Sequence, residues 1–86
     1  MTLVIGYHEI DDSSHWLASP KRDELLGGAG IGVKTFLDPE SPNRAAVLFD
    51  VPDMDAFQAL MQSPEAAEAM AHDGVRAETL IILLEA

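Results

Sequence analysis

The chain of 86 residues contains no cysteine, one tryptophan and one tyrosine. The absence of cysteine excludes a disulfide framework and a thiol nucleophile, and it is typical of proteins kept in a reducing compartment. The first ten residues lack the basic start and the long apolar segment of a signal peptide. The apolar run at 80–84 is far too short to span a bilayer. We therefore expect a cytoplasmic protein that does not enter the membrane.

Basic residues are also scarce. Five Lys and Arg stand against fifteen Asp and Glu, which gives a formal net charge of -10. A surface of this charge repels phosphate backbones and anionic lipids, so we expect neither nucleic acid nor a membrane surface as a partner. The acid excess has two interpretations, which are simple solubility and attraction of a basic partner or of metal ions.

What the sequence has in abundance is apolar residues, at 48% of the chain. They gather in segments with strand or helix periodicity, separated by turn residues. The helical segments carry Trp16 and Leu17 on the expected buried side of the first, and Ser-Pro pairs break both. The segments predict strands over 1–10, 31–37, 44–51 and 78–85, a first helix from about 13 to 26 interrupted at Pro20, a hairpin loop over 38–43, and a second helix from about 54 to 73 that restarts at Ser63-Pro64 and stops at Gly74.

The predicted order is β-α-β-β-α-β within a single domain, residues 1–86. This order is typical of the α+β class with a ferredoxin-like fold, a four-stranded antiparallel sheet with two helices on one face. In such a fold the uncovered sheet face meets water, and each strand should alternate apolar with polar residues. Here both faces of the strands are apolar, as Ile81 and Leu83 show opposite Leu80 and Ile82. We therefore expect a homodimer or a higher oligomer that buries the second face.

Two stretches resemble the dimeric α/β-barrel superfamily, and in particular a group of uncharacterised members. The first has the pattern His-x-Val-x-Asp-Tyr-x-x-Trp, present here as His8, Ile10, Asp12 and Trp16, with Ser13 in place of the tyrosine. The second comprises Pro42-Asn43, the strand AVLFDV, Ser63-Pro64-Glu65 and Gly74-Val75. The resemblance covers nearly the whole chain and implies the same fold and dimer.

The superfamily includes cofactor-free antibiotic-biosynthesis monooxygenases, polyketide cyclases, muconolactone isomerases and haem-degrading enzymes. The resemblance thus implies a cofactor-independent enzyme acting on an aromatic or polyketide-like molecule. The alternatives are a module that binds a small hydrophobic ligand without changing it, and an accessory dimerisation partner. Haem-degrading members carry a tryptophan and an iron-binding histidine at positions corresponding to Leu60 and Met70, so we expect no haem and no other cofactor.

Four residues are the candidates for a site. His8 has apolar neighbours on its strand face and is either a satisfied core histidine or a general base beside a pocket. Trp16 is either a core anchor or a pocket wall, and the resemblance adds Asp12 to the pocket. Asp50 shares a strand face with Ala46 and Leu48, and if that face is buried, His8 could be its partner. No spacing of His and acidic residues matches a metal-ligand signature, so we expect no metal.

Overall fold

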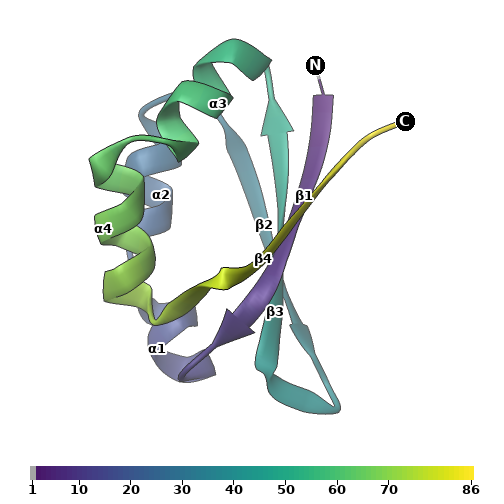
Figure 1. Cartoon of the computed structure of the whole chain (residues 1–86), viewed down its shortest axis with the longest axis vertical. Coiled ribbons are helices and arrows are strands. Elements are labelled where there is room, and N and C mark those ends of the chain that lie inside the picture. Colours follow the sequence, from purple (N-terminus) through teal and green to yellow (C-terminus); the bar gives the residue numbers. More distant parts are fainter. Residues whose placement is uncertain (1) are drawn as a thin grey trace.

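The computed structural model describes residues 2–86 and has a sheet with one layer of helices beside it (Figure 1). The strands are β1 (Thr2–Ile10), β2 (Gly32–Asp38), β3 (Ser41–Val51) and β4 (Val75–Leu84). The helices are α1 (Ser13–Ala18), α2 (Lys21–Gly27), α3 (Met54–Met61) and α4 (Pro64–Asp73). The α+β, ferredoxin-like order is confirmed. Each of the two expected helices is a pair of short helices, divided at Ser19-Pro20 and at Ser63-Pro64.

The helices begin and end where short polar side chains and glycine meet the backbone. Asp12 caps α1 by accepting hydrogen bonds from the backbone N–H groups of Ser14 (2.9 Å) and His15 (3.2 Å). Ser63 caps α4 in the same way, with proline at the first helical position. Gly74 ends α4 with a φ of 74°, a left-handed conformation that glycine adopts without strain.

The sheet is antiparallel throughout, in the order β2-β3-β1-β4, so β1 and β3 are central. The 38–43 segment is not the six-residue loop expected from its two prolines. The turn consists of residues 39–40, held by an Asp38 carboxylate that accepts from Glu40 N–H at 2.9 Å. Pro42 lies in β3 where the register with β2 shifts, a position at which its missing N–H is tolerated.

One sheet face lies under the helices and carries the core. Alternate residues of β1 and β3, such as Val4 and Phe49, are at most 6% exposed there, and Trp16, Leu26 and Phe57 pack onto them from the helices. Leu17 is 49% exposed, so its expected burial beside Trp16 is wrong. The short α1 makes one turn and a half, and Trp16 takes its single buried position.

We call the opposite side of the sheet the far face. The register places side chains of all four strands on it, and large apolar ones are 39–52% exposed: Leu3, Ile5, Tyr7, Phe36, Ile81 and Leu83. No element of residues 2–86 covers this face, as the one-sided helix layer in Figure 1 shows.

Candidate functional site

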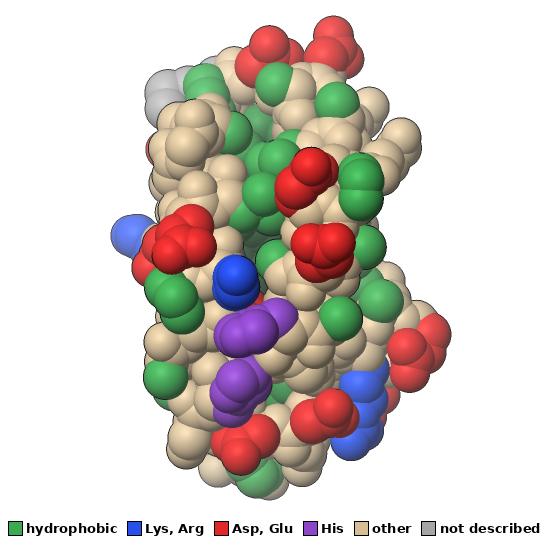
Figure 2. Space-filling model, turned by 90° about the vertical axis from the view of Figure 1, so that its left-hand side faces the viewer, with side chains coloured by type: hydrophobic (Ala, Val, Ile, Leu, Met, Phe, Trp, Pro, Cys, Tyr) green, Lys and Arg blue, Asp and Glu red, His purple; other side chains and the backbone are tan. Residues whose placement is uncertain are grey.

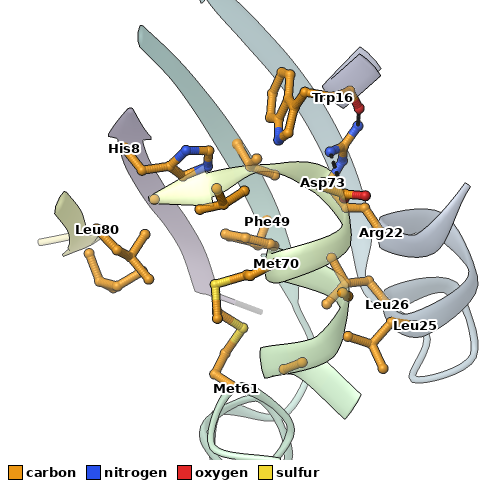
Figure 3. Close-up of a pocket in the computed structure, with 16 residues that line it drawn as sticks. His8, Trp16, Arg22, Leu25, Leu26, Phe49, Met61, Met70, Asp73 and Leu80 are labelled. Atoms are coloured by element: carbon orange, nitrogen blue, oxygen red, sulfur yellow. Dashed lines mark hydrogen bonds and ion pairs between the residues drawn. The ribbon is translucent and has the colours of Figure 1, made fainter. Parts of the chain in front are cut away.

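A cavity of about 70 Å³ lies between the sheet and the helices. Its walls come from β1, β3 and β4 on one side and from all four described helices on the other (Figure 3). Most lining side chains are apolar, and three are polar or charged: His8, Arg22 and Asp73. A mostly apolar pocket with a few converging polar groups is the usual form of a small-molecule site.

His8 enters the cavity from the middle of β1, where it pairs with Ala45 of β3. Its side chain belongs to the helix-covered face, and the residue is 6% exposed. Within residues 2–86 its Nδ1 atom has no hydrogen-bond partner, although it is fully buried. Burial lowers the pKa of His8 below the usual 6.5, an interaction with the Glu9 backbone partly offsets this, and the positive charge of Arg22 lowers the pKa a little further. His8 is therefore neutral at pH 7 and has an unused ring nitrogen.

Trp16 forms the wall next to His8. The two rings meet edge to face, with centroids 5.8 Å apart and an interplanar angle of 75°. The indole is 1% exposed, because α1 lays it directly on the sheet. Trp16 is thus both a core anchor and part of the cavity lining, so the two interpretations of this residue coincide.

The structure places the two candidate carboxylates away from the cavity. Asp12 is exposed, and its carboxylate is occupied with the backbone at the start of α1. Asp50 pairs with Leu3 of β1, so its side chain is on the far face, whereas His8 points to the helices. The suggested pairing of Asp50 with His8 is therefore wrong. The register between β1 and β3 decides this point, and the face on which Asp50 lies is the one that the helices leave uncovered.

Two charged residues of the cavity were missed in the sequence. Arg22, in the first turn of α2, places its guanidinium carbon 4.4 Å from the centroid of the Trp16 ring. Asp73, the last residue of α4, is 3% exposed, and its Oδ2 lies 3.9 Å from Arg22 Nη1. Nothing in the sequence distinguishes Arg22 from the exposed Lys21 beside it. Asp73 directly precedes Gly74, the residue at which the helix ends. Gly74 marks the end of the helix in the sequence but does not indicate that the Asp73 side chain is buried.

Two exposed histidines lie side by side on the helix layer, below a hollow in which apolar side chains are visible (Figure 2). His15 Nε2 lies 2.6 Å from the carbonyl oxygen of His72, and His72 Nδ1 lies 3.0 Å from Asp73 Oδ1. These contacts connect α1 to the end of α4 and hold Asp73 in place. In the described part of the chain, no three His, Cys, Asp or Glu side chains are grouped to hold a metal ion.

Gly6 provides space on the sheet side of the cavity. A Cβ atom at this position would lie 3.2 Å from Ile82 Cδ1 and 3.4 Å from Phe49 Cε2. Both values are close contacts, so a larger residue here would press on the cavity wall. Gly6 therefore leaves room on the His8 face of the sheet that a side chain would fill.

Comparison with known proteins places the fold. No protein-family model and no curated protein matches the chain. Solved structures do match: one described as an antibiotic biosynthesis monooxygenase is 16% identical over 100% of this chain and 97% of that one, with a TM-score of 0.67. A putative antibiotic biosynthesis monooxygenase from Bordetella bronchiseptica is 19% identical over 99% and 94%, with a TM-score of 0.73. Another from Deinococcus radiodurans is 15% identical over 100% and 91%, with a TM-score of 0.60.

The chain thus has the ferredoxin-like fold of the structures described as antibiotic biosynthesis monooxygenases, over its whole length. Identities below 20% establish this architecture and leave the chemistry to the residues of the cavity. Among the helices of residues 2–86, none is long and apolar enough to cross a membrane.

Proposed function

We propose that the cavity binds a small, mainly apolar carbonyl compound, aromatic or polyketide-like, and that neutral His8 removes a proton from it without a cofactor. The observation that carries the proposal is that His8 lines the cavity and that its buried Nδ1 lacks a hydrogen-bond partner in the described chain. A buried polar atom without a hydrogen bond is costly, and a catalytic role is one reason for its retention; perturbed pKa values such as that of His8 also cluster at functional sites.

The proposed step is enolisation. With the ring proton on Nε2, the Nδ1 lone pair takes the proton from the carbon next to the substrate carbonyl. The C–H electron pair becomes a carbon–carbon double bond, and the carbonyl π pair moves to the oxygen. Oxygenation by O₂, ring closure and double-bond migration all can begin from this enolate, so the step is common to monooxygenases, cyclases and isomerases. A base that is neutral at pH 7 is suited to it.

The size of the cavity limits the ligand. Its 70 Å³ is about half of the ~150 Å³ at which an engineered apolar cavity binds benzene. An aromatic ligand therefore needs the cavity to widen. Met61 and Met70 line both this cavity and an apolar groove that runs beside β4. Because methionine is unbranched and changes shape at little cost, we expect these two side chains to move aside when a ligand enters from the groove.

Deuterium exchange tests the proton transfer directly. The protein is incubated in D₂O with 2-indanone, a small aromatic ketone, and loss of the α-proton signal is followed by NMR. We expect enzyme-dependent exchange that falls by about 10²-fold or more in His8→Gln, the range for removing a general base. His15→Gln, which alters an exposed histidine, is the matched control and should keep the wild-type rate. Equal rates in wild type and His8→Gln would rule out this role for His8.

A second candidate function is binding without chemistry. The observation in its favour is the lining, which apart from the three polar or charged side chains is apolar and offers few groups to a reacting molecule. The two functions separate in the same experiment. A ligand that shifts the resonances of cavity residues but exchanges no proton supports binding alone.

We also propose that the far face pairs with the far face of a second copy. Four strands about 4.8 Å apart and about 30 Å long present a flat area of roughly 600 Å², and its side chains raise the accessible area further. This is close to the ~800 Å² per partner of a standard stable interface. Large apolar side chains that are about half exposed cover it, and a second copy offers the same apolar surface in return.

A further inference from the structure

Arg22 has more hydrogen-bonding capacity than its surroundings use. Its side chain is 12% exposed, and its Nη2 atom donates to the carbonyl oxygen of Trp16 at 3.4 Å. The other two nitrogens, Nε and Nη1, are buried and have no acceptor among residues 2–86. These two atoms carry three N–H hydrogens, and a guanidinium is a permanent cation that donates and never accepts. The end of the cavity at Arg22 therefore lacks an acceptor.

Asp73 does not supply the missing hydrogen-bond acceptor for Arg22. Its Oδ2 is 3.9 Å from Nη1, beyond hydrogen-bond distance, and its Oδ1 is engaged 3.0 Å from His72 Nδ1. The carboxylate thus balances the charge of Arg22 but leaves its hydrogens free. Figure 3 shows the guanidinium between Trp16 and Asp73, with His8 across the indole. The two polar groups with unused nitrogens, His8 and Arg22, both line the cavity and both contact Trp16.

We propose that Arg22 receives the carbonyl oxygen of the substrate and stabilises the negative charge that develops there as His8 removes the proton. This inference rests on the proposed function and names the substrate class more closely, as a neutral ketone whose oxygen lies at Arg22 and whose acidic C–H lies at His8. Charged hydrogen bonds to a developing oxyanion in a dry site are a strong form of transition-state stabilisation.

Charge balance supports a neutral ketone over a ready-made acid. The empty cavity holds one cation, Arg22, one carboxylate, Asp73, and a neutral His8, so its net charge is zero. Enolisation inside the cavity moves one proton from carbon to His8 and leaves one negative charge on oxygen. The sum stays at zero, with the new cation on His8 and the new anion on the substrate oxygen beside Arg22. A preformed anion would instead add an uncompensated charge unless a proton entered with it.

Binding of two isosteric probes tests Arg22 separately from His8. The probes are 4-nitrophenolate, whose anionic oxygen stands in for the enolate, and 4-nitrotoluene, which has the same shape without the charge. Titration calorimetry gives the two dissociation constants, and the indole N–H resonance of the single tryptophan reports whether the probe is in the cavity. In the wild-type protein we expect the anion to bind at least about tenfold more tightly, with uptake of a proton.

Arg22→Gln should abolish this preference for the anion over 4-nitrotoluene. Because Arg22→Gln leaves a buried carboxylate without its cation, the double variant Arg22→Gln/Asp73→Asn serves as a second test and should also show no preference. Asp73→Asn alone removes the competing negative charge and should increase the preference. An anion preference that persists without Arg22 overturns the inference. If neither probe binds even the wild-type protein, the cavity is not a ligand site, and the proposed function fails instead.

Discussion

Replacing Ile5 by aspartate places a charge at the centre of the far face. Ile5 lies on the central strand β1, with Leu48 opposite it on β3 and Leu83 opposite it on β4. It is 42% exposed in the single chain. In a two-fold dimer this residue meets the same region of the partner, so each substitution acts twice.

The expected loss follows from two contributions. Burying an isoleucine fully is worth about 1.5–3 kcal/mol, so covering the remaining 42% is worth about 1 kcal/mol per copy and about 2 kcal/mol per dimer. Removing two carboxylates from water adds a penalty of several kcal/mol, part of which the charges avoid by moving toward the rim. A total of about 4–6 kcal/mol weakens the dimer roughly 10³- to 10⁴-fold.

Sedimentation velocity over a range of protein concentrations measures the effect, and far-UV circular dichroism shows whether the variant is folded. We expect a dimer for the wild-type protein and a folded monomer for Ile5→Asp. Leu17→Asp is the matched control, because Leu17 is similarly exposed at 49% but belongs to the helix layer. A monomeric wild-type protein, or a folded Ile5→Asp that sediments as the wild-type dimer does, would show that the far face is not a dimer interface.

Three further predictions concern the cavity. Because the pKa of His8 is lowered in the folded state, the folded protein binds a proton less readily than the unfolded chain. The free energy of unfolding should therefore fall as the pH drops below about 6.5 toward the folded-state pKa. Urea unfolding of His8→Gln should not show this dependence on pH. Gly6→Ala places a methyl 3.2 Å from the mobile end of Ile82, so ligand affinity should fall several-fold while the fold survives, whereas Gly27→Ala, with no atom within 4 Å of the new methyl, should bind normally. Trp16→Ala should lower the free energy of unfolding by about 3–5 kcal/mol, measured in urea.

The fold was predictable because local signals agree with one another. Strand periodicity, capping residues and Ser-Pro breaks each point to the same order of elements, and the structure has that order. The errors lie where tertiary pairing decides. β4 begins at Val75, not at 78, because Val75 and Arg76 pair with Ile10 and Glu9 of β1. The polar residues of this segment are typical of a loop in the sequence. In the structure Thr79 accepts a hydrogen bond from Glu9 N–H at 2.8 Å, and this bond holds the segment against β1.

The site was predictable in part for the same reason. Strand alternation predicts that His8 and Tyr7 point to opposite faces of the sheet, and helical periodicity predicts that Trp16 is buried. Local periodicity therefore predicts the placement of both His8 and Trp16. The register between β1 and β3 is set by pairing over the whole chain, and it places Asp50 on the sheet face opposite His8. Arg22 becomes a cavity residue through a contact between α1 and α2 that no sequence spacing encodes.

Nitrogen-15 NMR of the three histidine rings, titrated with pH in the absence and presence of 2-indanone, shows whether His8 is a neutral base that meets the ketone. We expect His8 to titrate below 6.5 and to carry its proton on Nε2 when neutral, and we expect its Nδ1 resonance to shift when the ketone is added. The ring signals of His15 and His72, which lie on the outer surface, should shift far less when the ketone is added. A His8 that titrates at or above 6.5 and whose Nδ1 signal does not respond to the ketone would exclude this residue as the base.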